Sequence, residues 1–412
     1  MSKAIWLEQI SEAMMDKMDR RKFLCTSGSA LLLARSGHLA KADAGDDSPP
    51  PATLPHEAEA VRGLQSLKEH AHRHGLIAGA AVVVHELEDD PVLQRLVVEQ
   101  YGILVPENEL KWHSLRPSRD RFDFTQSDAL FAFAKSHRIK VRGHTMVWHN
   151  SVPEWLKNGN SQLDVRQLMV DHIRTVVGRY RGRVHSWDVV NEAILPSDNQ
   201  LDCLRKSFWF DRVGPDYIEL AFRTARDADP HAKLAYNDYG IEYDRPEDAV
   251  RRDAILALVH RLQERKAPID AVGIQSHIKA GASFPVGKGL AGFIESVRQM
   301  GFEVYLTEMD VNEDDLQFDD VAQRDLAIAR TYRDFLDVAL ANPAVKAMLT
   351  WGISDRRTWL NDGPTHHRKR RNRPQRALPF DREYRPKDAF FAIRDSIDAR
   401  HVSIETSRAK SS

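Results

Sequence analysis

Short apolar runs rich in β-branched residues alternate with longer amphipathic segments along the body of the chain. The longer segments have the spacing of surface helices: over residues 164–180, Met169, Ile173, Val176 and Val177 form one apolar stripe. Two further helices are predicted over residues 246–265 and 323–340. Short, nearly continuous apolar runs are typical of strands buried on both faces, as parallel strands are. The alternation therefore predicts repeated strand–helix units around a parallel sheet.

Eight segments carry the pattern of buried parallel strands. They cover residues 77–84, 102–105, 140–144, 184–191, 233–237, 271–275, 303–307 and 347–351. Eight parallel strands, each followed by a helix, close into a barrel. With 412 residues, 42% apolar and 29% charged, the chain is long enough for one such core with extensions. The predicted fold class is α/β, a single (β/α)8 TIM barrel preceded by an N-terminal export signal and a linker.

The N-terminal segment differs in composition from the predicted barrel. Residues 19–24 read Asp-Arg-Arg-Lys-Phe-Leu, a weakly apolar stretch follows over 25–34, and Ala-Asp-Ala stands at 42–44. This arrangement resembles a twin-arginine export signal with a small-residue cleavage site, with a basic N-terminal arm as the alternative because Arg35 interrupts the apolar stretch. We expect export to the periplasm or the medium. The predicted division is a signal region over 1–44, a Pro-rich linker over 45–56, the barrel over 57–400 and a frayed tail over 401–412.

The overall charge narrows the classes of partner. The 59 basic residues nearly balance the 60 acidic ones, which favours a neutral substrate over nucleic acid or an anionic membrane. A basic segment over 368–376 is interpreted as a solvated loop. Cys25 and Cys203 are not spaced as metal ligands or a redox pair, so Cys203 is expected to be a free thiol. No apolar run reaches the roughly 18 residues of a membrane span. We expect a monomer that needs no cofactor or metal.

Polar and aromatic side chains gather where the predicted strands end. The second strand is followed by Glu107, Asn108, Lys111 and Trp112, the third by His144, Trp148 and His149, the fourth by Asn191 and Glu192, the fifth by Asn237 and Asp238, the sixth by Gln275, Ser276 and His277, the seventh by Glu308, and the eighth by Trp351 and Trp359. Because catalytic groups of such barrels lie at the carboxyl ends of the strands, we expect these side chains to share one rim.

Two glutamates stand out at this rim, since Glu192 and Glu308 each close an apolar run. Hydrolysis of a glycosidic bond requires two such carboxyl groups, one to protonate the leaving oxygen and one to attack or stabilise the sugar. Considered alone, either residue is more simply an ion-paired or solvated carboxylate. A catalytic role for the two glutamates is therefore judged from the residues that flank them in the sequence.

Six short motifs stand at the predicted strand ends. They are Glu-Asn-Glu-Leu-Lys-Trp at 107–112, Gly-His-Thr-Met-Val-Trp-His at 143–149, Trp-Asp-Val-Val-Asn-Glu at 187–192, Gln-Ser-His at 275–277, Thr-Glu at 307–308 and Trp-Gly-Ile-Ser-Asp at 351–355. Together and in this order they resemble the endo-β-1,4-xylanases of glycoside hydrolase family 10. The resemblance spans roughly residues 57–393. It implies hydrolysis of xylan by a retaining double displacement.

The resemblance also implies roles for individual residues. Glu308 would be the nucleophile and Glu192 the acid/base, with carboxyl groups about 5–5.5 Å apart. Asn191 would bind the 2-hydroxyl of the attacked sugar, and His277 and Asp310 would orient Glu308. Asp188 is expected behind the groups that contact sugar. The remaining substrate-binding set is Glu107, Asn108, Lys111, His144 and Gln275 for hydroxyl groups, and Trp148, Trp351 and Trp359 as apolar walls.

Several alternatives accompany this interpretation. His144, His149 and His277 could suggest a metal site, but no His-X-His sequence follows the first strand, so hydrogen bonding is preferred. Trp187 begins its strand and is expected in the core. Asn237 and Asp238 either bind sugar or cap the next helix. At the level of function, the alternatives are a barrel that only binds carbohydrate and a retaining glycosidase for cellulose or mannan, because fold alone does not select the substrate.

One pair departs from the family pattern. Arg356 and Arg357 stand where the family more often has an aromatic or small residue. Because arginine pairs bidentately with carboxylates, the pair suggests a preference for acidic decorations on the polymer. The competing interpretation is a pair of surface charges of little energetic consequence.

Overall fold

The computed structural model describes residues 60–159, 163–361 and 373–410. The predicted signal region and linker, residues 1–44 and 45–56, lie outside the described residues, as does the first half of the basic segment 368–376. Within the described part, no helix combines the length and apolar character needed to cross a membrane.

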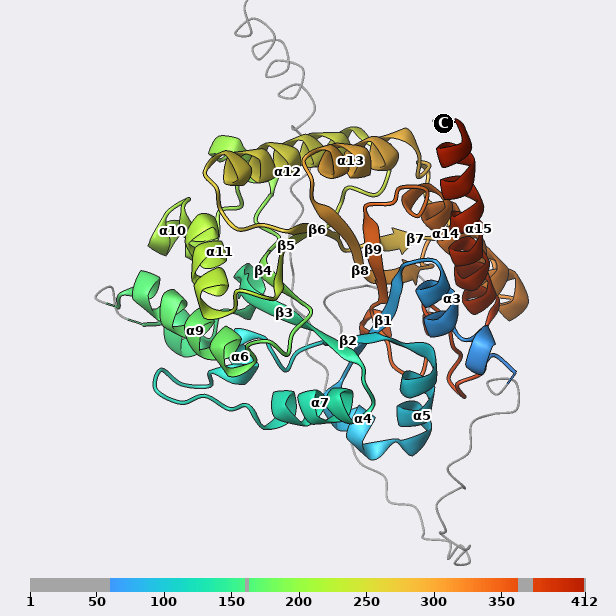
Figure 1. The fold of residues 1–412 in the computed structure, drawn as a ribbon, viewed down its shortest axis with the longest axis horizontal. Coiled ribbons are helices and arrows are strands. Elements are labelled where there is room, and N and C mark those ends of the chain that lie inside the picture. The colour runs from blue at the N-terminus through green and yellow to red at the C-terminus, as the bar shows by residue number, and fades with distance from the viewer. Residues whose placement is uncertain (1–59, 160–162, 362–372, 411–412) are drawn as a thin grey trace, which may run out of the picture. The chain divides into compact units, whose positions relative to one another are not determined.

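Eight parallel strands form a closed ring in the order β1-β2-β3-β4-β5-β6-β8-β9 and back to β1 (Figure 1). Their bounds are β1 Ile77–Val82, β2 Ile103–Pro106, β3 Lys140–Trp148, β4 Ser186–Asn191, β5 Lys233–Asp238, β6 Ala271–Ile274, β8 Glu303–Asn312 and β9 Val345–Thr350. The ring closes where Ile77 of β1 pairs with Ala347 of β9. The predicted single (β/α)8 barrel is confirmed.

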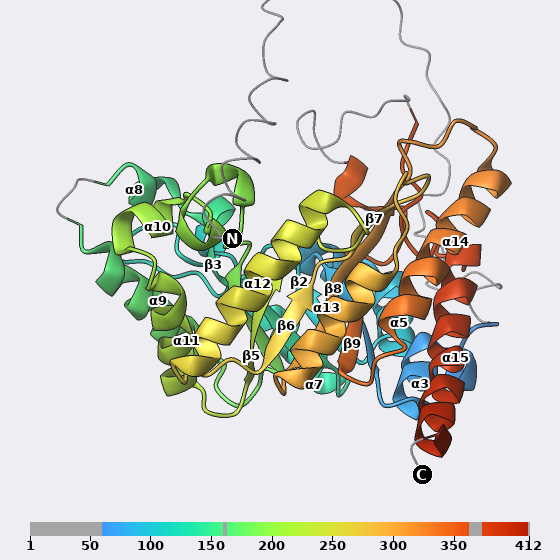
Figure 2. The ribbon, with the colours of Figure 1, turned by 90° about the horizontal axis from the view of Figure 1, so that it is seen from above.

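Helices surround the ring, and most lie between consecutive strands (Figures 1 and 2). They are α3 Leu67–Arg73, α4 Val84–Asp89, α5 Pro91–Gln100, α6 Trp112–Leu115, α7 Thr125–Ser136, α8 Glu154–Lys157, α9 Val165–Arg179, α10 Phe208–Val213, α11 Tyr217–Ala228, α12 Pro246–Glu264, α13 Lys288–Gln299, α14 Val321–Ala339 and α15 Asp388–Lys410. Short 3-10 turns occur at η1 Gly63–Gln65, η2 His149–Ser151, η3 Pro196–Asp198, η4 Leu201–Cys203 and η5 Trp359–Asn361. In both views α12 and α13 lie side by side on the outside of the barrel.

Two strands extend four or five residues beyond their predicted ends. β3 continues to Trp148, and β8 continues past Glu308 to Asn312. A short additional strand, β7 (His277–Lys279), pairs with this extension and sets His277 opposite Asp310. Three residues with one apolar side chain give no recognisable strand pattern, so the sequence did not predict β7. The pairing of β7 with this extension nevertheless holds His277 and Asp310 side by side at the candidate site.

The C-terminal prediction needs one correction. Helix α15 runs to Lys410, so the tail predicted to be frayed from residue 401 is helical almost to its end. Residues 401–410 contain neither glycine nor proline, and therefore nothing in them interrupts a helix already started at Asp388.

Apolar residues fill both sides of the sheet. A small cluster lies together on the strands: Ala81, Ile103, Val105, Ala235, Ala271, Tyr305, Ala347 and Leu349. A far larger cluster joins strands and helices. Trp187 of β4 belongs to this larger cluster with 0% exposure, so its predicted core position is confirmed. The indole fits because its neighbour in register on β3 is Gly143.

The contact between Trp187 and Gly143 is close enough to test. A Cβ added to Gly143 would lie 2.0 Å from Trp187 Cε3, so Gly143→Ala must displace the indole or the strand. We expect the free energy of unfolding to fall by about 1–3 kcal/mol, as for other overpacked cores, measured by denaturant titration.

Gly178 in α9 provides the matched control, because an added Cβ there meets nothing within 4 Å. Gly178→Ala should raise stability by about 0.5–1 kcal/mol, since alanine loses less conformational entropy in a helix. Equal stability of the two variants would contradict the packing described here.

Candidate active site

Glu308 lies on β8 with only 5% of its surface exposed. Asn237 Nδ2 donates to Glu308 Oε1 over 2.8 Å, and His277 Nε2 lies 3.3 Å from Oε2. Burial alone would raise the pKa of Glu308, but the hydrogen bond from His277, the charges of His144 and His277, and the hydrogen bond from Asn237 together lower it below its usual value. Glu308 is therefore an anion at neutral pH.

His277 connects Glu308 to a second carboxylate. Its Nδ1 lies 2.9 Å from Asp310 Oδ1, and Trp359 Nε1 donates to the other oxygen, Asp310 Oδ2, over 2.6 Å. Burial would lower the pKa of His277, but the charge and hydrogen bond of Asp310, followed by those of Glu308, raise it well above the usual value. A protonated imidazole donates from both nitrogens, so His277 can bind both carboxylates at once.

Glu192 follows β4 directly and has a left-handed backbone conformation, with φ of +58°. Its backbone is held from two sides, because its N–H donates to Asn237 O over 2.9 Å and its carbonyl accepts from Arg205 Nε over 2.7 Å. These bonds support a conformation that a residue with a Cβ adopts at a cost. The strand end is thus turned so that the Glu192 side chain lies among the residues of the rim.

The carboxyl group of Glu192 has a different set of neighbours from that of Glu308. Gln275 Nε2 donates to Oε1 over 3.0 Å and Asn191 Nδ2 over 3.3 Å. On the other side, His149 Nδ1 lies 3.8 Å from Oε2 and Arg205 Nη2 lies 4.0 Å from it. Burial and the charge of Arg205 lower the pKa of His149 to about 4, so this imidazole is neutral near pH 7. Glu192 therefore has no protonated imidazole like the one that contacts Glu308.

Asn237 links the two glutamates. Its Nδ2 donates both to Glu308 Oε1 and to Asn191 Oδ1, at 2.8 and 2.9 Å, while its Oδ1 accepts from Thr307 over 2.7 Å. The helix that follows has Arg245 as its N-cap residue, without a side-chain capping bond. Capping of the next helix is therefore excluded for Asn237, whose side chain instead contacts Glu308 and Asn191.

Asp238 lies behind the rim rather than on it. It is completely buried, accepts from the Tyr236 hydroxyl and from Ile194 N, and lies 3.5 Å from Arg251. Asp238 therefore supports the loop after Glu192 and does not cap a helix.

Asp188 occupies the layer beneath His144. Arg142 pairs with Asp188 Oδ1, and His144 Nδ1 lies 3.0 Å from Asp188 Oδ2. All three side chains are almost completely buried. A carboxylate on Nδ1 fixes the orientation of the ring and leaves the other imidazole nitrogen available, which is how second-layer carboxylates commonly act on histidine.

A cation and two indoles form another part of the rim. Lys111 Nζ lies 4.9 Å from the ring centre of Trp148 and 5.9 Å from that of Trp351. It also donates to Asn108 Oδ1 over 3.3 Å. The Trp351 ring lies 5.3 Å from that of His144, in an edge-on arrangement. Flat apolar faces beside hydrogen-bonding groups are suited to sugar rings and their hydroxyls.

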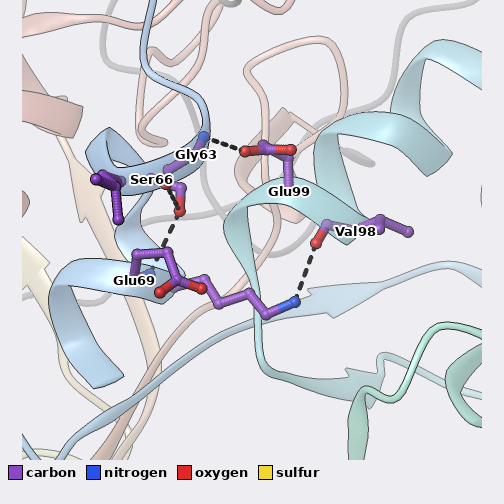
Figure 3. A pocket seen from close by; sticks show the side chains of 7 residues that line it. Gly63, Ser66, Glu69, Val98 and Glu99 are labelled. Carbon is purple, nitrogen blue, oxygen red and sulfur yellow. Dashed lines mark hydrogen bonds between the residues drawn. The ribbon is translucent and has the colours of Figure 1, made fainter. Parts of the chain in front are cut away.

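A surface hollow of about 300 Å³ lies away from these residues. It is lined by Gly63, Leu64, Ser66, Lys68, Glu69, Val98 and Glu99 (Figure 3). Val98 and Glu99 belong to the last turn of α5, just before β2 begins, so the hollow lies near the amino ends of the strands. Barrel active sites lie at the opposite face.

Known proteins with similar sequences and structures identify the family of this chain. The model of glycosyl hydrolase family 10 matches residues 66–396. The chain belongs to glycosyl hydrolase family 10. Endo-1,4-beta-xylanase B of Thermotoga neapolitana is 34% identical over 316 residues, covering 76% of this chain and 86% of that protein. A beta-1,4-xylanase of Dictyoglomus thermophilum is 34% identical over 347 residues, covering 81% of this chain and 92% of the relative.

Solved structures of family 10 proteins share the fold. Xylanase 10B of Thermotoga maritima has a TM-score of 0.73 at 33% identity, covering 81% of this chain and 98% of that structure. Xylanase 10B of Thermotoga petrophila, solved in complex with xylobiose, has a TM-score of 0.72 at 32% identity with the same coverage of 81% and 98%. Family membership therefore rests on both sequence and structure.

Residues predicted as the site of this family 10 chain come together at the carboxyl ends of the strands. Hydrogen bonds, ion pairs or ring contacts join each of the following residues to others of the set: Asn108, Lys111, His144, Trp148, Asp188, Asn191, Glu192, Gln275, His277, Glu308, Asp310, Trp351 and Trp359. Glu107 interacts with Lys111 through their charges. The sequence missed Arg205. This residue lies in a loop after η4, where neither a strand end nor a motif marks it.

The three candidate metal-binding histidines instead contact carboxylates. His144 lies against Asp188, His149 is near Glu192, and His277 lies between Asp310 and Glu308. Among the described residues, no group of three or more possible ligands is arranged to hold a metal ion.

Each residue of the arginine pair contacts another segment of this chain. Arg357 pairs with Glu86 of α4, and the Arg356 guanidinium lies 5.6 Å from the ring centre of Tyr384. Both contacts are internal, which favours the interpretation as structural surface charges over recognition of acidic decorations.

Glu107 should give the protein a measurable pH dependence. Burial raises the pKa of Glu107 from 4.5 to about 7, despite the opposing charges of Arg357 and Lys111. Because the folded state holds this proton more tightly than the unfolded state, the stability contribution is present below about pH 4.5 and is lost as the pH rises through about 7.

We therefore expect the free energy of unfolding of the wild type, relative to Glu107→Gln, to decrease by about 3 kcal/mol between about pH 4.5 and pH 8. Denaturant titrations of both proteins across this range measure the difference. Parallel pH curves would show that Glu107 is not the group responsible.

Proposed function

We propose that this family 10 chain hydrolyses internal β-1,4-xylosidic linkages of xylan with retention of the anomeric configuration. The observation that carries the proposal is the asymmetric pair of glutamates. Glu308 is a buried anion held by an amide and a cationic imidazole, whereas Glu192 is held by amides beside a neutral imidazole. Retaining hydrolysis needs this division between a charged nucleophile and a carboxyl group that can carry a proton.

Each glutamate has a defined part in the two steps. In the first, a Glu308 oxygen bonds to C1 of the sugar while the C1–O bond to the leaving chain breaks and Glu192 gives its proton to the departing oxygen. In the second, Glu192 takes a proton from water as the water oxygen bonds to C1, which releases Glu308 as a carboxylate. Two inversions at C1 give net retention.

Residues around the pair support the binding of a neutral sugar polymer. Trp148, Trp351 and Trp359 offer flat apolar faces, and Lys111 and Asn108 offer polar groups along the same rim. Asn191 contacts Glu192 and is joined to Glu308 through Asn237, and a bond from it to the sugar 2-hydroxyl would strengthen as charge develops at C1. Relatives named xylanases, and a family member solved with xylobiose, support xylan as the polymer.

The two alternative functions are less well supported. A barrel that only binds carbohydrate has no need of a nucleophile held by Asn237 and His277 opposite a second carboxyl group. A cellulose-directed enzyme deserves a direct assay, because one relative at 33% identity is named exoglucanase XynX. Export through the predicted signal at residues 1–44, and the monomeric state, remain predictions from the sequence.

Incubation of the purified chain with xylan, cellulose and mannan tests the proposal. Xylan should release xylo-oligosaccharides much faster than the other two release products, and proton NMR of the first products should show the β-anomer before mutarotation. Initial α-anomer would reject the retaining mechanism, and no release from xylan would reject the substrate.

Two variants separate the roles of the glutamates. Glu308→Ala should abolish turnover of every substrate, because the covalent step is lost. Glu192→Ala should lose about 10²–10⁴-fold on xylan but far less on an aryl xyloside whose leaving group needs no proton. Equal losses of Glu192→Ala on the two substrates would contradict its role as the acid.

A further inference from the structure

We propose that Trp359 is a positioning residue for the nucleophile in addition to a wall of the sugar path. Its indole N–H fixes the Asp310 carboxylate, which in turn holds His277 against Glu308. This inference rests on the proposed function, since it assigns a role in preparing Glu308 for attack.

Four side chains form one continuous hydrogen-bonded row. Trp359 Nε1 donates to Asp310 Oδ2 over 2.6 Å, Asp310 Oδ1 lies 2.9 Å from His277 Nδ1, and His277 Nε2 lies 3.3 Å from Glu308 Oε2. Asp310 is 1% exposed, so water has little access to replace a missing partner. The Trp359 ring also lies 5.1 Å from the His277 ring. Trp359 therefore contacts two members of the row.

The charges along this row explain why an indole is a suitable hydrogen-bond donor to Asp310. Glu308 and Asp310 are carboxylates on either side of the His277 cation. A second cation on Asp310 would weaken its attraction for His277, whereas an indole N–H donates without adding charge and does not titrate in the working range. The indole N–H therefore holds one Asp310 oxygen without adding charge, which leaves the other oxygen directed at His277 Nδ1 and the opposite ring nitrogen facing Glu308.

The loop carrying Trp359 is anchored at its base. Asp355, four residues earlier, pairs with Lys387 over 2.7 Å, and both are almost completely buried. Asn361, two residues later, accepts from the backbone N–H of Gln375 over 3.0 Å. Gln375 Oε1 accepts in turn from Glu313 N over 3.0 Å, just past the end of β8. The indole is thus held relative to the strand that carries Glu308 and Asp310.

Trp351 provides the matched comparison. It faces the same rim, against His144 and Lys111, and among the described residues no carboxylate accepts a hydrogen bond from its indole N–H. Replacing either tryptophan by phenylalanine keeps an aromatic face and removes an N–H. Only at Trp359 does that change remove a bond to Asp310.

The experiment compares the pH dependence of kcat/KM on xylo-oligosaccharides for wild type, Trp359→Phe and Trp351→Phe. The acidic limb of the kcat/KM curve reports the pH at which the row of Asp310, His277 and Glu308 loses its last proton to reach the ionised state in the free enzyme. Without the indole donor, the ionised row of Asp310, His277 and Glu308 gains a proton more readily. The acidic limb of Trp359→Phe should therefore move to higher pH by about 0.5–1 unit, while that of Trp351→Phe stays at the wild-type position.

A change confined to KM in Trp359→Phe, with an unmoved acidic limb, would overturn the inference and leave Trp359 as a wall only. Inactivity of the wild type on xylan would instead reject the proposed function. The wild-type protein offers a second test that does not depend on folding of the variant. Its Trp359 indole N–H should resonate downfield and exchange slowly with solvent, and a freely exchanging indole would also overturn the inference.

Discussion

Closure of the parallel sheet between β9 and β1 is the constraint on which the rest of the molecule depends. Glu192, directly after β4, and Glu308, on β8, are separated by more than a hundred residues, yet the closed ring brings the carboxyl-terminal parts of both strands to one rim. Apolar side chains buried on both faces of the strands stabilise the ring, and close packing such as that of Trp187 on Gly143 fixes its register. Because the carboxyl ends of all the parallel strands lie on one face of the barrel, polar residues at those ends lie close together whatever residues fill the core.

Charge then distinguishes the two glutamates that closure brings together. His277, cationic between Asp310 and Glu308, stabilises the anion of Glu308 at a depth where an unpaired carboxylate would be protonated. Glu192 has amide donors and a neutral His149 instead, and its nearest cation among the described residues, the Arg205 guanidinium, lies 4.0 Å away. Asn237 contacts Glu308 directly and reaches Glu192 through Asn191, so one buried amide links the two carboxyl groups by side-chain hydrogen bonds. Different neighbours thus give identical residue types different chemistry.

The sequence predicted the parts of this arrangement that depend on local pattern. Buried parallel strands appear as apolar runs, and polar residues directly after them mark the rim, so eight strands and both glutamates were recognisable. Contacts between distant segments left weaker signals: β7 is too short to show a period, and Asn237 could equally have capped a helix until its bond to Glu308 was seen. Arg205 holds the Glu192 carbonyl from a loop without any motif. Tertiary hydrogen bonds, rather than propensity, place these residues.

Glu308 is expected to form the covalent bond to the sugar. Treating the wild-type protein with an activated 2-deoxy-2-fluoroxyloside slows the second step and accumulates the glycosyl–enzyme, which mass spectrometry of the intact chain and its peptides can locate. We expect one added fluoroxylosyl group per chain, on the peptide that contains Glu308. A label on Glu192, or full inactivation without any covalent adduct, would contradict this expectation.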